Sequence, residues 1–365
     1  MRFTTNTKPF SDALSLGIIN ANVSNYHKKS NIAQISATTD TLKINLEASN
    51  IKTEIRLKGS GEGERASIFV SSLLIKQLVA TLESATVTLE FAENGLILHS
   101  GTSSFTLPKV IEANELDLDA PAVPSQTAET ITIDKSDWKF IKENQMYAIA
   151  MSFVHPVYTR VWIGAEGDVL VGDFDSSLFT HSKHSKLGSQ CLLSDTIINL
   201  FISLPDGAKL TKLGREYLVT CSADSFEYVT QFKPLYEADE GVGDYNSSIF
   251  LTLLREPAST ITVSATNLSK FLGQADLLSS TTEDTIQMIK SGNTLELKDK
   301  HVDCKVTVTG TTQDFSLEFW TASLKKVISN YGDESIRIAP LVSEGEVTGI
   351  GIWTSELATC IAAKE

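Results

Sequence analysis

Short runs of alternating apolar and polar side chains recur through most of this chain. Residues 86–91, 130–133 and 305–309 show the pattern, and all three runs are rich in β-branched residues. A period of two with β-branched residues predicts strands that bury one face. Six further windows instead place apolar residues at helical spacing. The pattern therefore predicts an α+β fold, in which helices pack on one face of antiparallel sheets.

The six helical windows form two series with a regular spacing. Corresponding windows recur after about 120 to 130 residues, which is the length of one domain. The first series and then the second cover residues 8–21, 135–147, 265–278, 71–82, 194–203 and 321–331. Three tandem units, each with two helices, follow from this spacing.

The sequence leading into the second helix of each unit supports the repeat. In each unit an apolar strand meets a hydroxyl residue, and the apolar stripe of a helix follows. Serine and threonine are good helix caps because their side-chain oxygen accepts a backbone N–H. The three hydroxyl residues are Ser71, Ser194 and Thr321.

Two segments without a sustained period separate the units. Residues 112–129 are acidic and contain two prolines, and residues 237–247 contain two glycines and four acidic residues. Such segments connect domains rather than pack into them. The predicted domains are residues 1–120, 121–250 and 251–365.

Composition and charge exclude several classes of protein. The chain has 365 residues, of which 42% are hydrophobic and 21% are charged, so it is globular rather than disordered. Its formal net charge of -14 excludes a generally basic surface, and any contact with DNA must be local.

Cysteine usage and the N-terminus bear on the compartment. The four cysteines lie far apart without a Cys-x-x-Cys pair, which argues against a zinc site and a disulfide scaffold. The N-terminus lacks an apolar signal region, and no stretch has the roughly 20 apolar residues that span a bilayer. The sequence therefore predicts a cytoplasmic protein without a membrane contact.

Several short stretches, together with the threefold layout, are similar to one known family. They are residues 2–4 (Arg-Phe-Thr), the strand pair of residues 95–108, the Asp244-Tyr245 pair, and residues 174–179. In these features the chain resembles the bacterial-type DNA sliding clamp, the beta subunit of DNA polymerase III. The departures from the family pattern identify a divergent member, with a phage origin as one alternative.

The resemblance implies a processivity factor. Two chains would close head to tail into a ring that slides on duplex DNA, with each chain forming half of it. An α-helix is about 10 Å across, so twelve helices give a circumference of about 120 Å and a hole of about 35 to 40 Å, wide enough for a duplex. The implied partners are DNA contacted without sequence preference, a DNA polymerase, a clamp loader and a second copy. No catalytic residue, metal or cofactor is expected.

Charge is distributed as such a ring requires. The helical windows carry eight lysines against five acidic residues, a net of +3, which leaves -17 for the rest of the chain. A sliding protein must attract phosphates without reading bases, although lysine is also common on any helix surface. Two loops matching family loops add further candidates, with simple solvation or turn packing as the alternatives. The residues predicted to contact DNA are Lys28, Lys29, Lys76, Lys139, Lys142, Tyr158, Arg160, Lys270, Lys325 and Lys326.

The family also implies an apolar cleft that takes a short peptide from the polymerase or loader. Residues 358–365 lack the bulky methionine and the proline of the family's end. We therefore expect a cleft that prefers the peptide of its own polymerase. Carried over by position, the cleft residues are Phe174, Ser176, Ser177, Phe179, Gly243, Ile249, Cys360 and Ala362.

Two other classes of function are weighed against the clamp. Asp173 and Asp175 share one face of a strand, and His181 and His184 follow closely, which is the pattern of a metal-dependent hydrolase. Two nearby lysines would repel the ion, and no third ligand is placed. A structural viral assembly protein would share the acidic composition. Residues 59–63 are glycine-rich without the lysine of a phosphate loop, so a hairpin turn is expected there.

Overall fold

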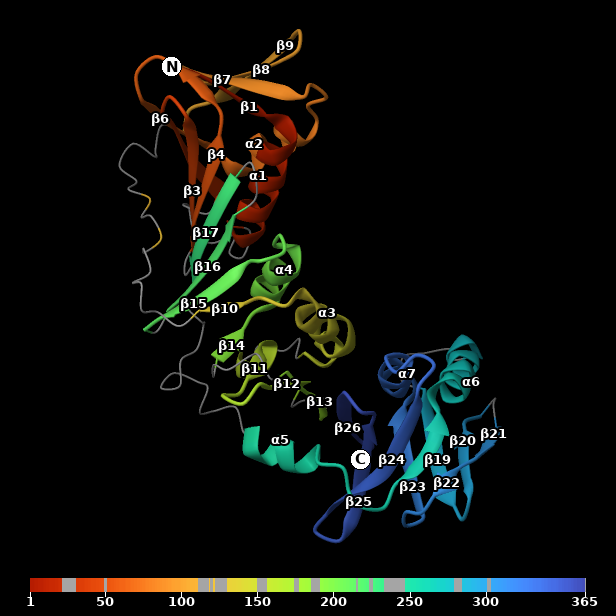
Figure 1. Ribbon diagram of the computed structural model, residues 1–365. Coiled ribbons are helices and arrows are strands. Elements are labelled where there is room, and N and C mark those ends of the chain that lie inside the picture. The colour runs from red at the N-terminus through yellow and green to blue at the C-terminus, as the bar shows by residue number, and fades with distance from the viewer. Residues whose placement is uncertain are drawn as a thin grey trace. The chain divides into compact units, whose positions relative to one another are not determined.

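Helices and antiparallel strands make up the computed structural model of the chain (Figure 1). The structure describes the chain apart from residues 22–30, 49–50, 111–117, 119–120, 122–129, 150–155, 174–176, 185–190, 215, 223–225, 233–246, 279–283, 301–302 and 365. The chain divides into two compact units, Met1–Lys135 with Asp195–Leu235, and Ser136–Ser194 with Tyr236–Glu365.

Among the described residues, the first unit contains two sheets and three helices. Helices α1 (Thr7–Ala21) and α2 (Ser72–Ala80) pack against each other, and α1 also contacts α4 (Asp195–Ser203) and strands of the larger sheet. The five-stranded sheet has the order β5 (Ser60–Glu62), β1 (Arg2–Asn6), β7 (Thr86–Ala92), β8 (Gly95–Ser100) and β9 (Ser103–Pro108). The eight-stranded sheet has the order β10 (Thr130–Thr132), β15 (Lys209–Leu213), β16 (Glu216–Ser222), β17 (Phe226–Phe232), β4 (Ile51–Lys58), β3 (Thr41–Ala48), β2 (Ile32–Ala37) and β6 (Ala66–Ser71).

The second unit also combines a large and a small sheet. Its helices are α3 (Lys135–Asn144), α5 (Ser247–Leu253), α6 (Ala265–Leu278) and α7 (Thr321–Ser329), with the short 3-10 turns η3 (Met146–Ala148) and η4 (Pro156–Thr159). The nine-stranded sheet has the order β14 (Cys191–Leu193), β11 (Val161–Ile163), β12 (Asp168–Asp173), β13 (Leu178–Lys183), β26 (Leu357–Ala362), β25 (Glu346–Trp353), β24 (Ser335–Ser343), β18 (Ile261–Ser264) and β22 (Thr309–Gly310). The four-stranded sheet has the order β21 (Asp303–Thr307), β20 (Thr294–Lys298), β19 (Thr285–Ser291) and β23 (Phe315–Trp320).

The six helices expected from spacing are all present, and the described residues add a seventh, α5. Helix α2 begins as predicted, because the Ser71 hydroxyl accepts the backbone N–H of Leu74. Helix α7 begins differently: Trp320 occupies the N-cap position, and Thr321 is the first helical residue, with its side chain buried. None of the described helices has the length and apolar character needed to cross a membrane.

Each large sheet joins strands from distant parts of the sequence. In the first unit β4 pairs with β17 along its length, and in the second unit β13 pairs with β26. The middle third of the chain therefore shares one sheet with each outer third. The three domain boundaries remain a prediction, and the two linkers expected at residues 112–129 and 237–247 fall almost entirely outside the described residues.

The predicted hairpin at residues 59–63 is wrong. Its residues form β5, which pairs with β1 in the five-stranded sheet, while the strands on either side, β4 and β6, lie apart in the eight-stranded sheet. A Cβ on Gly61 would collide with the carbonyl oxygen of Thr38, and one on Gly59 would collide with that of Thr4. The glycines allow this close backbone approach where the chain passes from one sheet to the other.

Candidate functional site

Most of the lysines predicted to contact DNA lie on the open faces of amphipathic helices. Helix α3 buries Trp138 and Ile141 and leaves Lys139 exposed, with Lys142 partly exposed. Lys270 on α6 is exposed, and Lys76 on α2 is partly exposed. This placement follows from the helical period, because the apolar stripe fixes which side chains face away from the sheet.

The two lysines of α7 have different surroundings. Leu324, Val327 and Ile328 are buried and form the apolar stripe of this helix. Lys325 forms an ion pair with Asp276 of the neighbouring helix α6, so part of its charge is already neutralised. Lys326 is exposed, and its Nζ lies 6.0 Å from the centroid of the Tyr147 ring. Of the two, Lys326 is therefore better suited to attract a phosphate.

Tyr158 and Arg160, two of the predicted DNA contacts, lie in and directly after the 3-10 turn η4. Tyr158 is only 4% exposed, and its ring packs edge-on against Phe179 and Phe250. A ring packed in this way presents no free face to a base, so its surroundings give Tyr158 no support as a DNA contact. The Arg160 Nη1 donates hydrogen bonds to the carbonyl and hydroxyl oxygens of Thr159, so its guanidinium is held at the end of η4.

Five of the predicted site residues lie outside the part of the chain that the structure describes. They are the loop lysines and three members of the peptide cleft: Lys28, Lys29, Phe174, Ser176 and Gly243. Their roles remain predictions.

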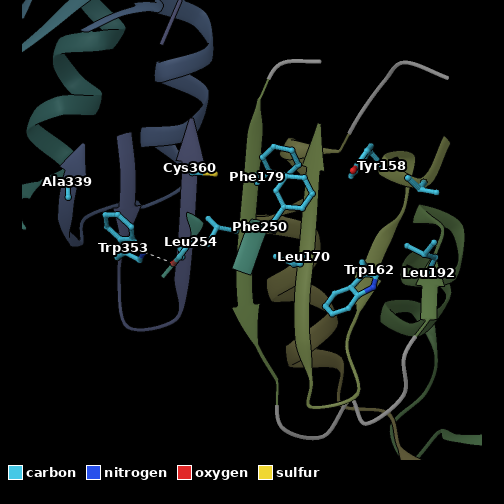
Figure 2. Close-up of a cluster of buried hydrophobic side chains, with 12 residues drawn as sticks. Tyr158, Trp162, Leu170, Phe179, Leu192, Phe250, Leu254, Ala339, Trp353 and Cys360 are labelled. Carbon is cyan, nitrogen blue, oxygen red and sulfur yellow. Dashed lines mark hydrogen bonds between the residues drawn. The ribbon is translucent and has the colours of Figure 1, made fainter. Parts of the chain in front are cut away.

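The structure brings four other predicted cleft residues together on β13 and β26. Phe179 is paired with Cys360 across the two strands, and the Ala362 N–H donates to the Ser177 carbonyl over 3.2 Å. Phe179 and Cys360 belong to a buried apolar cluster (Figure 2). The fifth, Ile249, lies on α5 with its side chain exposed.

Phe250 is a member of this cluster that the sequence prediction missed. Its ring stacks on Phe179 with the centroids 3.9 Å apart and the planes at 22°. Figure 2 shows the two rings face to face, with Tyr158 beside them. The apolar run Ile249–Leu254 is the sequence signal that marks this segment. In the described part of the chain, aromatic side chains therefore pack against Phe179, one of the residues predicted to line the cleft.

The cysteines provide a probe of whether this cluster opens. All four are free, with Cys304 partly exposed and Cys360 buried, and burial raises the pKa of the Cys360 thiol to about 12. Since the thiolate is the reactive form, we expect iodoacetamide to modify Cys304 at least about 100-fold faster than Cys360. Peptide mass spectrometry after timed labelling measures both rates. Equal rates would show that the cluster is open in solution.

The histidines expected in a metal site instead form separate hydrogen-bonded pairs. The His181 Nε2 lies 2.9 Å from the Asp168 carboxylate, and the His184 ring contacts Asp137 and Ser182. In the described part of the chain, no group of three or more histidine, cysteine, aspartate or glutamate side chains is placed to hold a metal ion. Asp175 falls outside the described residues, and the hydrolase alternative gains no support.

Comparisons with known proteins add evidence on the fold. No protein-family model and no curated protein matches the sequence. Among solved structures, the DNA polymerase III subunit beta from Pseudomonas aeruginosa is 14% identical with a TM-score of 0.77, and the match covers 100% of both chains. The beta sliding clamp of C. crescentus is 12% identical with a TM-score of 0.79, covering 100% of this chain and 99% of the other.

A third match, the DNA polymerase III beta subunit from Thermotoga maritima, is 15% identical with a TM-score of 0.76, and covers 100% of this chain and 99% of that one. Identities this low carry information on fold alone. They agree with the α+β architecture and with the resemblance that the short sequence stretches indicate. The chain therefore has the fold of the bacterial DNA polymerase III beta subunit, the sliding clamp.

Proposed function

We propose that this protein is a processivity factor that works by enclosure rather than by catalysis. Two copies close into a cytoplasmic ring around duplex DNA and hold a DNA polymerase on its template. The observation that carries the proposal is the extent of the structural match, which covers the whole of this chain and essentially the whole of each sliding clamp. A shared local motif would not require every part of the clamp fold to be kept.

DNA contact in the proposed ring is electrostatic and independent of sequence. Against a net charge of -14, lysines on the open faces of the helices offer local positive charge. Such side chains hold phosphates without fixing a register, which permits sliding. The burial of Tyr158 removes it from this set. The proposed DNA contacts are Lys28, Lys29, Lys76, Lys139, Lys142, Arg160, Lys270, Lys325 and Lys326.

A head-to-tail dimer needs two different complementary surfaces, one on each unit. In the first unit, β9 is the edge of its sheet, and Phe105 on it is exposed. In the second unit, α6 ends with Leu277, which is 84% exposed, and Leu278, which is 55% exposed. Unpaired edges and neighbouring exposed leucines are features of interaction surfaces. We place the dimer contact between β9 of one copy and the end of α6 of the other.

Polymerase and clamp loader are proposed to dock at the cluster around Phe179 and Cys360. Ala362 ends β26, Ser177 lies directly before β13, and Ile249 lies on α5, next to the apolar cluster. An apolar cluster beside the exposed residues Ser177 and Ile249 suits a short peptide with apolar anchors. The altered tail predicts a preference for the peptide of the chain's own polymerase. Titration of that peptide and of a common bacterial clamp peptide tests this, and equal affinities would contradict it.

Enclosure is tested by threading the protein onto linear DNA and then blocking both ends with streptavidin. The complex should survive salt of about 1 M, where the screening length is only about 3 Å and phosphate contacts are lost. Cleavage of the DNA by a restriction enzyme should then release the protein. Light scattering should give twice the mass of one chain. Release that does not depend on the ends would contradict the proposal.

A further inference from the structure

A chain of polar side chains, two of them buried and two partly buried, connects both ends of helix α3 to β13 and the residue after it. In the first turn, the Asp137 carboxylate lies 3.0 Å from His184 Nδ1. The other ring nitrogen of His184 lies 2.8 Å from Ser182 Oγ on β13. Ser182 in turn bonds over 2.7 Å to Gln145, the residue that follows the helix. The network therefore holds α3 at its start and at its end.

Aspartate, histidine and serine in this order are also the groups of a hydrolytic triad, but the Gln145 amide excludes that role. Its nitrogen faces the Val169 carbonyl and the Thr180 hydroxyl, each at 3.4 Å. The Thr180 hydroxyl donates its own hydrogen to Val171, so it can only accept from Gln145. The amide oxygen of Gln145 therefore faces Ser182 and takes the single hydroxyl hydrogen of that serine.

The position of Ser182 leads to the same conclusion. The residue is only 2% exposed, and its backbone lies within the ladders that β13 forms with β12 and β26. The hydroxyl hydrogen is already given to Gln145, so His184 cannot remove it. A nucleophile needs a removable proton and access to its substrate. Ser182 has neither, and its role in this network is structural.

The hydrogen bond that Ser182 donates to Gln145 determines the protonation state of His184. Since the serine oxygen can only accept from the ring, His184 Nε2 must donate to it. His184 Nδ1 faces the Asp137 carboxylate, which also only accepts when ionised. Both ring nitrogens then carry hydrogen. We infer that His184 is held as an imidazolium and acts as a proton-dependent lock on helix α3.

The lock has a consequence for DNA binding that rests on the proposed function. Helix α3 carries Lys139 and Lys142, which are among the proposed phosphate contacts. His184 does not touch DNA in this proposal. It is a positioning residue, because it fixes the helix that presents those two lysines.

Among the charged groups near His184 in the described structure, Asp137 provides the carboxylate that is hydrogen-bonded to the ring. A cavity of about 580 Å³ lies beside the ring, bounded by α3, the end of β13 and the segment before β26. Lys183 points to Glu166 and Asp168 at 3.8 and 3.9 Å, and His181 is paired with Asp168. The titratable and charged groups lining this cavity are Asp137, His181, Lys183, His184 and Glu356.

The effect of removing a proton follows from the hydrogen count. The lock is complete while the imidazole carries both hydrogens and the Asp137 carboxylate is ionised. Loss of either ring hydrogen removes one of the two hydrogen bonds that the ring donates. A neutral ring therefore holds helix α3 less firmly than the imidazolium does.

The protonation state is tested by nitrogen NMR on protein with 15N-labelled histidine. The His184→Gln spectrum identifies the His184 signals by their absence. We expect hydrogens on both ring nitrogens of the wild-type residue near neutral pH. A neutral His184 ring at about pH 6 would overturn the inference. Covalent labelling of Ser182 by a fluorophosphonate would also overturn it, since it would show a reactive hydroxyl.

The effect on α3 is tested by hydrogen exchange, with His181→Gln as the matched control. His181 on β13 is also paired with an aspartate, but that partner, Asp168, belongs to β12 rather than α3. We expect protection of the α3 amides to fall about tenfold in His184→Gln and to remain unchanged in His181→Gln. Wild-type protection should fall when the ring loses a proton as the pH is raised, after correction for intrinsic exchange, and the variant should show no such step.

Two outcomes would overturn the lock: equal loss of protection in both variants, or a pH-independent α3 in the wild type. If His184→Gln fails to fold, Asp137→Asn serves in its place, because it keeps the side-chain shape and removes the charge. Salt-dependent retention on end-blocked DNA is measured in parallel. If the hydrogen-exchange protection of α3 depends on pH but the protein is not retained on end-blocked DNA, the inference about His184 stands and the proposed function is rejected.

Discussion

Replacing Leu277 with aspartate is expected to convert the proposed dimer into monomers. Leu277 is 84% exposed in the single chain and follows the open face of α6 to its end, where Leu278 is also exposed. A carboxylate buried without a partner in an apolar contact costs several kcal/mol. A loss of about 4 kcal/mol corresponds to a dimer Kd about 1,000-fold higher. Light scattering over a range of concentrations measures the change.

The same substitution at Val342 is the matched control. Val342 is an apolar residue of the same unit, 53% exposed, and it lies beside the turn between β24 and β25. Val342→Asp should keep the dimer mass, and both variants should unfold at the wild-type temperature, because each side chain lies in solvent in the single chain. Phe105→Asp on β9 should act like Leu277→Asp, with no further loss in the double variant. A dimeric Leu277→Asp would place the contact elsewhere.

The helices were the best predicted part of the fold because their information is local. The window at residues 265–278 coincides with α6 (Ala265–Leu278), whose apolar stripe repeats over several turns. Helix α5 (Ser247–Leu253) was missed because seven residues give only two turns of period, and they adjoin a predicted linker. A short helix of this kind is stabilised by what it packs on, such as Phe179 under Phe250, and that partner is far away in sequence.

The sheets were harder to predict because a period of two identifies a strand but not its partner. Alternation identified β10 and β21, yet nothing local indicates that β4 pairs with β17 or that β13 pairs with β26. Glycines at residues 59–63 were interpreted as a turn, their commonest use. Here they allow β5 to approach neighbouring backbone closely, a requirement that depends on the tertiary structure alone.

In the candidate site, too, local features could be predicted and contacts between distant residues could not. Periodicity placed the lysines of α3, α6 and α7 on open faces, but it could not show that Lys325 pairs with Asp276 on another helix. The spacing of His181 and His184 suggested a metal site. His184, however, lies directly after β13, and along extended chain residues an odd number apart point to opposite faces. The two rings consequently reach different partners, Asp168 and Asp137.

Replacing Gly172 with alanine is expected to destabilise the protein by about 2 to 3 kcal/mol. A Cβ at this position of β12 would overlap the ring of Phe179 on β13. That ring cannot simply move aside, because Phe250 is stacked on it and Tyr158 packs against both. Chemical denaturation measures the loss. Alkylation of Cys360, which is paired with Phe179 across β13 and β26, should become faster in the same variant.

A double-mutant cycle separates this collision from other effects of the added methyl group. Phe179→Leu removes the ring that the Cβ would meet, so Gly172→Ala should cost less than about 1 kcal/mol in that background. If the stability losses of the two substitutions simply add, the strain lies elsewhere.

The Gly172→Ala variant also bears on docking, because a peptide that binds at this cluster must displace the Phe250 ring. The added Cβ already disturbs the stack of Phe179 and Phe250. Gly172→Ala should therefore bind such a peptide more tightly, although the variant itself is less stable. Weaker binding would indicate that the peptide needs the intact stack.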